Sequence, residues 1–497
     1  MQLEELMRNI NFETTSPQLS NRDIHAITAD SRKVEKGSLF VALRGEQSDG
    51  HDFINDAITH GAAAVVATSL IIHKKKIRIP KHIGVILVDD SRAILGHIAS
   101  KFFNHPSKKL RIVGITGTNG KTTTTNILAA LLEPVGKTAV LGTVELRIGN
   151  YTAPASMTTP DPCALHSYFK EMLDRGAVYC AMEVSSHALS QSRVDGVNFY
   201  SAIFTNLTQD HLDYHKNMES YFDAKSKLFR DFPLAKTAVM NIDDPYGKKL
   251  METATVPVAT YGFSADAMFR AEALQFSANQ TKFLFVAPQF EVEITMPLLG
   301  RHNIYNFLAA AAIAVNEGIS KPQLLNQASK LLTPRGRLEE IMSGEWPFKV
   351  FVDYAHSPDA MEKILLFFRS IGVRRIIVVF GCGGDRDRTK RPIMGHVAEK
   401  YADIVILTSD NPRSEKPESI VKDIKEGLNN ADSKKIFDIL DRREAIQTAI
   451  NMAGEGDIIA ILGKGHESVQ IIGEKRLPFS DQMVTREILK ERRLVSH

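Results

Sequence analysis

Seven consecutive residues have the types and spacing needed to hold a polyphosphate: Thr116-Gly117-Thr118-Asn119-Gly120-Lys121-Thr122. They follow the apolar run 110–115 and precede residues 123–132, which have the pattern of a helix. In such a turn the backbone N–H groups surround phosphates, Lys121 can reach the outer oxygens and Thr122 can bind Mg²⁺. Ile115 stands where a glycine is usual, so the loop is a variant of the common motif. An ordinary glycine turn is the competing interpretation, but the strand-to-helix context favours binding of a nucleoside triphosphate.

A carboxylate and an imidazole follow two later apolar runs. Glu183 lies at the end of the run 178–184, and Asp210 and His211 come just after the run 202–207. Ligands of open parallel sheets bind beyond the carboxyl ends of the strands, and Mg²⁺ prefers oxygen ligands. Glu183 or His211 alone would be more typical of an ordinary polar residue at a strand end. Their joint placement after the loop favours a magnesium site.

A glycine-rich turn later in the chain begins like a dinucleotide-binding fingerprint. The turn, Gly381-Cys382-Gly383-Gly384-Asp385-Arg386, follows an apolar run, but Arg386 occupies the position of the closing glycine. We therefore expect no nicotinamide cofactor. A plain turn at a strand end explains the glycines, although it does not explain the charged residues 385–388.

The elements that must position these residues alternate along the chain. Helix-length segments separate short apolar runs at 39–43, 64–66, 85–88, 139–141, 179–184, 202–207, 350–352, 376–380, 404–407 and 458–462. This alternation predicts parallel sheets covered by helices. Residues 104–109 and 333–337 have the composition of linkers. We predict an α/β protein of three domains: an N-terminal α/β domain (1–108), a central parallel-sheet domain with the phosphate loop (109–334) and a C-terminal Rossmann-like domain (335–497).

Composition narrows the class of protein. A chain of 497 residues with 61 Lys and Arg against 58 Asp and Glu, a net charge of +3, is too balanced to favour a nucleic-acid or membrane surface. Its three scattered cysteines fit reduced thiols rather than a disulfide framework. The N-terminus lacks the order of a secretory signal, and no apolar run approaches the ~20 residues of a membrane helix. We expect a cytoplasmic monomer that binds small molecules.

Several motifs together resemble the Mur ligases, a family of ATP-dependent enzymes that form amide bonds in peptidoglycan precursor synthesis. They are the phosphate loop, Glu183-Val184-Ser185-Ser186-His187, Thr205-Asn206-Leu207, Asp210-His211-Leu212-Asp213, Ala224-Lys225, Gly300-Arg301-His302-Asn303 with Asn306, and Asp353-Tyr354-Ala355-His356-Ser357-Pro358. The resemblance extends through all three predicted domains. Segments 30–32, 191–193 and 410–413 resemble the branch that adds the third residue of the peptide. The family's chemistry implies that ATP converts a carboxylate into an acyl phosphate, which an amine then attacks.

The resemblance also implies roles at the ATP site. Lys121, Glu183, His211 and Lys225 would be catalytic, and Thr122, Glu183 and His211 would lie at Mg²⁺ sites. Lys225 matches a lysine that the family carbamylates to N6-carboxylysine, which turns a cation into an anionic oxygen ligand; a solvated helix face is the competing interpretation. Asn303 and Asn306, three apart on a helix, would approach adenine, although Asn303 could instead cap the helix. The implied ATP-binding residues are Gly117, Thr118, Asn119, Gly120, Lys121, Thr122, Thr123, Asn303, Asn306, Arg337 near the phosphates and Asp353 near the ribose.

A nucleotide sugar is the second implied substrate, with the D-glutamate carboxylate of UDP-N-acetylmuramoyl-L-alanyl-D-glutamate as the acceptor. Hydroxyls, amides and one arginine suit sugar and pyrophosphate oxygens. Glu46 departs from the neutral or basic residue expected beside a pyrophosphate, and its contact could be made by the backbone. The matching positions are Ala29, Ser31, Glu46, Gln47, Ser48, Thr158, Thr159, Ser185, Gln191 and Arg193.

Arg413 bears on the choice of incoming amino acid. It follows the run 404–407, and Pro412 stiffens the turn that aims it. A guanidinium pairs bidentately with a carboxylate, and meso-diaminopimelate differs from L-lysine by one extra carboxylate at its far end. We therefore predict addition of meso-diaminopimelate; L-lysine is the alternative, because Arg413 could instead make a structural salt bridge. The residues that match the family's amino-acid contacts are Arg386, Asp410, Asn411, Pro412, Arg413, Gly463 and Glu467, with Glu467 suited to the distal ammonium.

Two further functions compete with this prediction. A folylpolyglutamate synthetase would share the phosphate loop but should lack the uridine-site residues. A nucleotide-dependent switch would bind ATP or GTP without making a bond. The switch is disfavoured because the chain has no Asn-Lys-x-Asp guanine motif and because the C-terminal Arg386, Arg413 and Glu467 would have no purpose.

Overall fold

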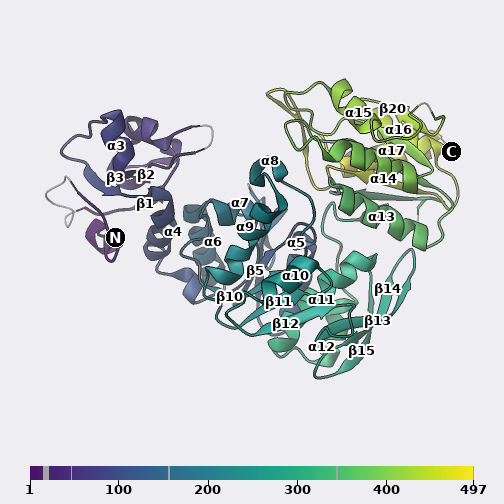
Figure 1. Ribbon diagram of the computed structural model, residues 1–497, viewed down its shortest axis with the longest axis horizontal. Coiled ribbons are helices and arrows are strands. Elements are labelled where there is room, and N and C mark those ends of the chain that lie inside the picture. The colour runs from purple at the N-terminus through teal and green to yellow at the C-terminus, as the bar shows by residue number, and fades with distance from the viewer. Residues whose placement is uncertain (15–21, 46–47, 155–156, 343–344, 432, 496–497) are drawn as a thin grey trace. The chain divides into compact units, whose positions relative to one another are not determined.

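The computed structural model describes residues 1–14, 22–45, 48–154, 157–342, 345–431 and 433–495 (Figure 1). The chain forms two compact units. The first consists of Met1–Thr116, Gly136–Ala202 and Ala224–Thr237, and the second of Gly117–Val135, Ile203–Asp223 and Ala238–His497.

The N-terminal part of the first unit is a four-stranded parallel sheet of β1 (Ala26–Thr28), β2 (Ser38–Val41), β3 (Ala62–Thr68) and β4 (Gly84–Val88), in that order. Its helices are α1 (Leu3–Met7), α2 (Ile54–Thr59), α3 (Ser69–Lys75) and α4 (Ser91–Phe102). Successive residues of β2 face opposite cores, since Leu39 belongs to the cluster with Leu95 of α4 and Phe40 to the cluster with Ile54 of α2. Burial of both faces explains why these strands are apolar runs.

The rest of the first unit carries strands in the order β10 (Phe199–Phe204), β5 (Arg111–Thr116), β9 (Tyr179–Glu183), β6 (Thr138–Leu141), β7 (Glu145–Ile148) and β8 (Tyr151–Pro154). Strands β5, β9 and β6 are parallel, and β7 and β8 add an antiparallel extension that the sequence patterns did not predict. The helices are α6 (Pro162–Asp174), α7 (Ser186–Ser190) and α9 (Met218–Arg230), which begins in the second unit. The carboxyl ends of β5, β9 and β6 therefore lie at one edge.

The second unit begins at the phosphate loop and helix α5 (Lys121–Leu132), which packs on α11 (Arg301–Asn316). Residues Ala309–Ala312 of α11 are fully buried, and their small side chains allow close helix packing. Strands follow the order β15 (Glu291–Met296), β14 (Thr281–Val286), β13 (Phe269–Phe276), β12 (Val258–Gly262) and β11 (Thr237–Asn241), with β13 to β15 antiparallel. The remaining helices here are α8 (Leu212–His215), α10 (Pro245–Met251) and α12 (Lys321–Ala328).

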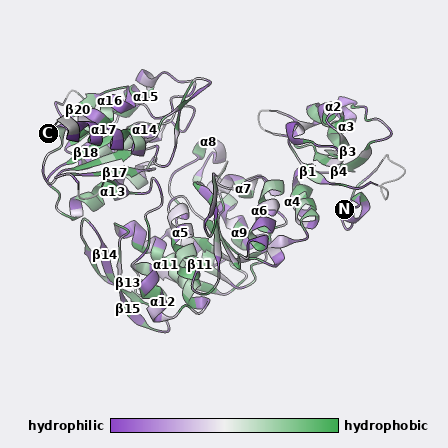
Figure 2. Ribbon diagram, turned by 180° about the vertical axis from the view of Figure 1, so that it is seen from behind, coloured by the Kyte–Doolittle hydropathy of each residue, from purple (hydrophilic) through white to green (hydrophobic). Residues whose placement is uncertain are grey.

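The C-terminal part of the second unit is a six-stranded sheet in the order β16 (Glu339–Ile341), β17 (Lys349–Asp353), β21 (Ile458–Leu462), β18 (Ile376–Phe380), β19 (Ile404–Leu407) and β20 (Ile436–Asp438). All pairs are parallel except β16 with β17. Helices α13 (Pro358–Ser370), α14 (Lys390–Tyr401) and α15 (Pro417–Lys425) cover one face, and α16 (Arg442–Met452) and α17 (Asp481–Val495) the other. A hairpin of β22 (Val469–Ile472) and β23 (Lys475–Pro478) follows β21. In Figure 2 strands β17 and β18 are largely green, the colour of hydrophobic residues.

The predicted α/β architecture with largely parallel sheets is confirmed. The ten apolar runs coincide with strands, for example residues 376–380 with β18. The domain boundaries after residues 108 and 334 remain predictions. No described helix combines the length and the apolar character that a membrane crossing requires.

Candidate active site

The phosphate loop is tightly packed at the start of α5. Gly117 and Gly120 have φ angles of 149° and 89°. A Cβ on Gly117 would lie 1.8 Å from Thr205 Oγ1, and one on Gly120 would lie 2.4 Å from Asn306 Oδ1. Both positions therefore require glycine. Lys121 Nζ donates to the carbonyl oxygens of Gly117 and Thr118 at 3.0 and 2.8 Å, which holds the ammonium over the loop.

Residues that follow β10 fix the backbone of the loop. Thr205 Oγ1 and Asn206 Nδ2 donate to the carbonyl oxygen of Asn119 at 2.7 and 3.0 Å, and Asn119 N donates to Asn206 Oδ1 at 3.0 Å. The side chain of Asn119 donates to Asp359 Oδ2 on α13 at 2.9 Å. The loop is thus held through both its main chain and a side chain.

A cavity of about 710 Å³ opens beside the loop. Asn303 and Asn306 line it, and Asn306 Nδ2 donates to Asn303 Oδ1 at 3.0 Å while Asn303 Nδ2 donates to the carbonyl oxygen of Leu299 at 2.8 Å. The prediction that both amides share one face of the helix is confirmed, and Gly300 rather than Asn303 is the N-cap. Apolar walls with a few fixed amides suit a nucleotide base; the apolar lining includes Phe276, Ile364, Leu366 and Phe367.

Asp353, at the end of β17, lines the same cavity as Arg337. Its carboxylate accepts hydrogen bonds from the backbone N–H groups of Leu338 and Ala355, both at 2.6 Å. Burial raises the pKa of Asp353, and the charge of Arg337 opposes that rise. Arg337 Nη2 donates to Thr122 Oγ1 at 3.0 Å. The linker arginine therefore contacts the loop residue predicted to bind Mg²⁺.

Glu183, at the end of β9, is oriented by Thr143, which follows the neighbouring strand β6. Thr143 N and Oγ1 donate to Glu183 Oε1 and Oε2 at 2.8 and 3.0 Å. Thr158 Oγ1 lies 3.0 Å from Thr143 Oγ1, and Thr159 Oγ1 donates to the carbonyl oxygen of Glu183 at 3.0 Å. Ser185 N donates to Thr159 Oγ1 at 3.1 Å. Glu183 is thus connected, directly or through one neighbouring residue, to three residues predicted to contact the nucleotide sugar: Thr158, Thr159 and Ser185.

Lys225, in the first unit, and His211, in the second, are the other two residues that were predicted to bind the ion. Lys225 on α9 is 1% exposed, so its interpretation as part of a solvated helix face is wrong. His211 Nε2 lies 3.5 Å from Asp210 Oδ2, which is also 3.5 Å from His356 Nε2. Burial acts to raise the pKa of Asp210, but the hydrogen bond and charge of His356 hold it well below its usual value. No group of three or more His, Cys, Asp and Glu side chains suited to a metal occurs in the described part of the chain; the predicted set also uses a hydroxyl and a lysine.

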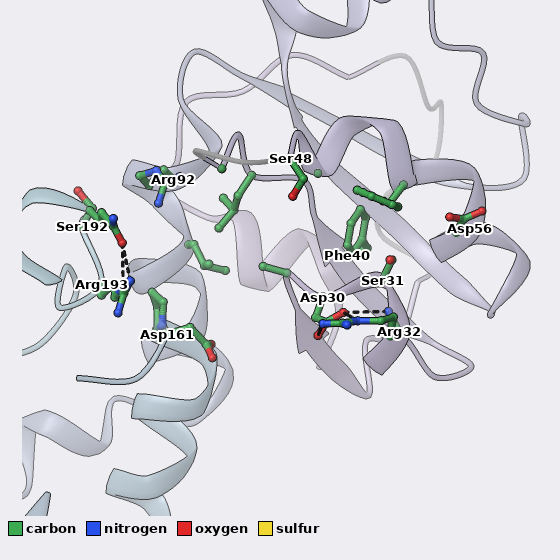
Figure 3. A pocket seen from close by; sticks show the side chains of 18 of the residues that line it. Asp30, Ser31, Arg32, Phe40, Ser48, Asp56, Arg92, Asp161, Ser192 and Arg193 are labelled. Atoms are coloured by element: carbon green, nitrogen blue, oxygen red, sulfur yellow. Dashed lines mark hydrogen bonds and ion pairs between the residues drawn. The ribbon is translucent and has the colours of Figure 1, made fainter. Parts of the chain in front are cut away.

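A second cavity, of about 660 Å³, lies in the first unit (Figure 3). Five residues predicted to contact the nucleotide sugar line it: Ala29, Ser31, Ser48, Gln191 and Arg193. Thr158, Thr159 and Ser185 are not part of its lining, although Arg193 Nη1 donates to the carbonyl oxygen of Thr159 at 3.2 Å. Glu46 and Gln47 lie outside the described residues.

Three guanidinium groups line this cavity, those of Arg32, Arg92 and Arg193, and that of Arg32 is paired with Asp30 at 2.9 Å. Gln191 Oε1 accepts from Arg193 Nε and Nη2 at 3.0 and 2.5 Å, which fixes that guanidinium. Arg92, near the start of α4, also lines the cavity, as Figure 3 shows, and donates to the carbonyl oxygen of Arg44. Guanidinium groups in a cavity suit an anion such as a pyrophosphate. Arg92 was not predicted from the sequence, although its place just after β4 follows the strand-end rule.

The predicted amino-acid contacts gather at one edge of the C-terminal sheet. They follow β18, β19 and β21, where β18 is paired with both of the others, so their carboxyl ends meet. Gly463 has a φ of 111°, and a Cβ at this position would lie 2.6 Å from Asp410 Oδ2. Burial raises the pKa of the Asp410 carboxyl group. A Cβ on Gly383 would lie 2.9 Å from Arg413 Nη1 and 3.7 Å from Arg386 Cγ, so both arginines flank the glycine turn.

Arg413 and Glu467 give this edge charges of both signs. Arg413 Nη1 donates to the carbonyl oxygen of Gly384 at 2.6 Å, and burial, followed by the charge of Arg386, lowers the pKa of Arg413. Arg413 makes no ion pair with any described residue, so its interpretation as a structural salt bridge is wrong. Glu467 Oε2 accepts from Asn411 Nδ2 at 2.7 Å. A guanidinium and a carboxylate at one edge are complementary to a zwitterionic amino acid.

Three residues that contact the predicted site residues were not predicted from the sequence. Thr143 follows an apolar run, so the strand-end rule could have found it. Tyr221, whose hydroxyl lies 3.2 Å from Thr118 Oγ1, and Asp359, which binds Asn119, carry no local signal. Both lie on helices that only the fold brings to the loop.

Three domain profiles of the Mur ligase family match the chain. They are the Mur ligase family catalytic domain at residues 23–103, the Mur ligase middle domain at 115–314 and the Mur ligase glutamate ligase domain at 336–465. The chain is also 41% identical to a relative over 493 residues, which cover 99% of both chains. It therefore belongs to the Mur ligase family, and the predicted class of ATP-dependent amide-forming ligase is confirmed.

The relatives define a branch of this family. The relative with 41% identity, from Syntrophomonas wolfei, is named UDP-N-acetylmuramoyl-L-alanyl-D-glutamate–2,6-diaminopimelate ligase. A solved structure of a ligase with the same name is 32% identical, has a TM-score of 0.68 and is covered over 99% of both chains. A folylpolyglutamate synthase of Mycobacterium tuberculosis, complexed with ADP and AMPPCP, has a TM-score of 0.63 but only 18% identity, with 75% of this chain and 92% of that chain covered. That second likeness concerns the fold alone.

Proposed function

We propose that this chain joins meso-diaminopimelate to UDP-N-acetylmuramoyl-L-alanyl-D-glutamate, with ATP as the energy source, in peptidoglycan precursor synthesis. The observation that carries the proposal is the meeting of Arg386, Arg413 and Glu467 at one edge of the C-terminal sheet. The arginines would bind the distal carboxylate of diaminopimelate and Glu467 its distal ammonium. Asp410, Asn411, Pro412 and Gly463 would complete this site. The name of the full-length relative agrees with this assignment.

The reaction has two steps, and neither requires a covalent bond to the protein. An oxygen of the D-glutamate carboxylate attacks the γ-phosphorus of ATP, and ADP leaves. The amine nitrogen then attacks the acyl carbon, an amide bond forms, and inorganic phosphate and one proton leave. Phosphoryl transfer depends on positioning and on neutralising the spreading negative charge. We expect Lys121 to exchange its bonds to Gly117 and Thr118 for phosphate oxygens.

The cavity beside the loop would hold the nucleoside of ATP. Asn303 and Asn306 would contact adenine and Asp353 the ribose, while Arg337 would approach the phosphates. This assignment is supported by their shared lining of the cavity and by the contact of Arg337 with Thr122. The loop residues 117–123 would surround the phosphates through their N–H groups.

Mg²⁺ is part of the proposal. Thr122, Glu183, His211 and a carbamate on Lys225 would hold the ions, and this donor set, rich in oxygen, fits the preference of Mg²⁺. The fit is supported by Thr143, which orients both carboxylate oxygens of Glu183 at a strand end. A bound ion would supply neutralisation of phosphate charge.

The carbamate on Lys225 has its own test. An ammonium that is 1% exposed would repel a nearby cation, whereas a carbamate would bind it. Lys225→Ala should lose most activity, and added bicarbonate should not restore it. Lys227→Ala, two residues further along α9, is the matched control and should stay active. Active enzyme with only a free amine on Lys225, observed by native mass spectrometry and by ¹³C NMR with labelled bicarbonate, would refute the carbamate.

The cavity in the first unit would bind the UDP-muramoyl part of the acceptor. Arg193 and Arg92 would face the pyrophosphate, and the hydroxyls of Ser31 and Ser48 would face sugar or uracil oxygens. Thr158, Thr159 and Ser185 would lie toward the reacting end, because their hydrogen bonds lead to Glu183. Ala29 lines the same cavity. The assignment of Glu46 and Gln47 as substrate contacts rests on the family resemblance alone.

The proposal includes a cytoplasmic location and a monomeric state. The substrates ATP and a nucleotide sugar are cytoplasmic compounds, and Cys163, Cys180 and Cys382 are free thiols.

Phosphate release tests the function. The purified chain is supplied with ATP, Mg²⁺ and the muramoyl dipeptide, and then with meso-diaminopimelate, L-lysine or L-glutamate. We expect release that requires the dipeptide and is fastest with meso-diaminopimelate. A preference for L-lysine would overturn the amino-acid assignment, a folate acceptor with glutamate would favour folylpolyglutamate synthesis, and ATP hydrolysis without acceptor or amine would favour a switch.

A further inference from the structure

Lys464 is a fully buried lysine that lies between two of the proposed amino-acid contacts, Gly463 and Glu467. Its exposed fraction is 0%. Its Nζ donates to Asn411 Oδ1 at 3.1 Å, to Glu467 Oε2 at 2.9 Å and to the carbonyl oxygen of Val469 at 2.8 Å. An ammonium carries three N–H donors, so each has an acceptor. A buried charge is costly unless it is paired and hydrogen-bonded. The three hydrogen bonds therefore offset the cost of burying this ammonium.

Glu467 is left with one oxygen available to a ligand. Its Oε2 accepts from both Lys464 Nζ and Asn411 Nδ2. No hydrogen bond from a described residue reaches Oε1, and the side chain is 28% exposed. Burial acts to raise the pKa of Glu467, but the charge and the hydrogen bonds of Lys464 and Asn411 hold it below its usual value. Glu467 is therefore an ionised carboxylate with one fixed edge and one open edge.

The same lysine attaches the β22–β23 hairpin to the segment 410–413. Val469 begins β22, and Ile471 N in the same strand donates to Asn411 Oδ1 at 2.9 Å. Gln470 Nε2 donates to the carbonyl oxygen of Asp410 at 2.9 Å. Lys464 thus joins the loop after β21, the loop after β19 and the hairpin.

The charge of Lys464 bears on which amino acid this edge of the sheet would accept. Within the described chain, neither Arg386 nor Arg413 has an ion-pair partner, whereas Glu467 is paired with Lys464. Without Lys464, Glu467 would face the site as an uncompensated anion and would repel a distal carboxylate. Its attraction for a distal ammonium would favour diaminopimelate and L-lysine alike. Compensation of the charge of Glu467 by Lys464 would therefore favour the substrate that carries the extra carboxylate.

We propose that Lys464 is a positioning and specificity residue for the diamino acid. It directs Glu467 Oε1 to the distal ammonium and cancels the charge of Glu467, so that a carboxylate can bind nearby. This inference rests on the proposed function, because it presumes that the edge formed by Arg386, Arg413 and Glu467 binds the amino acid.

The substitution Lys464→Met tests the role, because methionine retains an unbranched apolar chain but lacks the charge and the donors. Loss of a hydrogen bond to a charged partner should raise the KM for meso-diaminopimelate about 10- to 100-fold. The KM for ATP should change less than about twofold, since the ATP site lies on other elements. The preference for meso-diaminopimelate over L-lysine, measured as the ratio of kcat/KM values or from inhibition by L-lysine, should fall. The matched control is Lys475→Met in β23, which changes the same atoms on an exposed residue and should leave all of these values unchanged.

A purely structural role makes a different prediction. It would lower the melting temperature and change the KM values for ATP and diaminopimelate together, and that result would overturn the inference, as would an unchanged KM for diaminopimelate. If K464M does not fold, K464M/E467Q is compared with E467Q, because removing both charges leaves no unpaired buried ion. The KM values of these two variants should agree within about threefold if Lys464 acts through Glu467. A further tenfold rise in the double variant would refute that route.

Measurements on the wild-type chain distinguish a failure of the proposed function from a failure of the role of Lys464. A wild type that is inactive with every diamino acid overturns the proposed function. An active wild type whose K464M variant retains its KM and its preference overturns the role of Lys464 alone.

Discussion

Replacing Thr143 by valine tests whether the orientation of Glu183 matters for catalysis. Thr143 Oγ1 donates to Glu183 Oε2 at 3.0 Å, while Thr143 N donates to Oε1 at 2.8 Å. Valine keeps the branched shape and the backbone N–H and removes the hydroxyl alone. Glu183 is 1% exposed, so water has little access to replace the lost donor.

The expected size of the effect follows from this geometry. A hydrogen bond to a charged group contributes about 1.5–3 kcal/mol. A tenfold change in rate corresponds to about 1.4 kcal/mol, so kcat/KM should fall about 10- to 150-fold. The Mg²⁺ concentration for half-maximal rate should rise, because Glu183 is a proposed ligand of the ion.

The assay is phosphate release across a Mg²⁺ titration with the other substrates saturating. Thr143→Ser retains the hydroxyl and should stay within about threefold of the wild type, which controls for the loss of the methyl group. Melting temperatures exclude unfolding as the cause. A valine variant with a normal rate and normal Mg²⁺ dependence would refute the role of Thr143 and weaken the assignment of Glu183.

Other perturbations test the C-terminal part. Arg413→Ala should raise the KM for meso-diaminopimelate about 10- to 100-fold in steady-state kinetics, because a charged hydrogen-bonded pair is lost; an unchanged KM would contradict the assignment. Arg442→Met should lower the free energy of unfolding in urea by about 3–5 kcal/mol, because its fully buried partner Asp481, 2.8 Å away, is left unpaired; a loss below about 1 kcal/mol would speak against this pairing. The hydrogen bond from Arg391 lowers the pKa of Glu415 from 4.5 to about 2, so this carboxylate stabilises the fold above pH 4.5 and loses that effect as the pH falls to about 2. Glu415→Gln should therefore melt below the wild type at neutral pH, and this difference should shrink in acid; a difference independent of pH would refute it.

Much of the fold could be predicted because its parallel strands are buried on both faces. Such strands are continuous apolar runs, as in 376–380 and 458–462, and each coincides with a strand of the C-terminal sheet. The apolar residues 283–287, which include most of β14, form such a run as well and were not predicted as a strand, whereas β13 and β15 contain no comparable run. Their residues alternate between buried and exposed, for example in Glu291–Met296, so their mean hydropathy does not stand out.

Part of the candidate site could also be predicted, because some of its residues belong to local sequence patterns. Glycines with positive φ and polar residues after strands carry a local signal, which identified the loop and Glu183. Thr143 carried the same signal and was missed. Asp359, which binds Asn119, carries none, because the contact joins residues 240 positions apart.

The sequence by itself determined the phosphate loop, the alternation of strands and helices and the family, because each depends on local residue order. Tertiary structure alone decided the burial of Lys225, the fixing of Glu183 by Thr143 and the hydrogen bond from Lys464 to Asn411. The groups that pair with a charged side chain, and the exposure of that side chain, depend on which strands become neighbours. In a parallel sheet these neighbours are separated by whole helices, as β21 is from β18, so no local pattern specifies them.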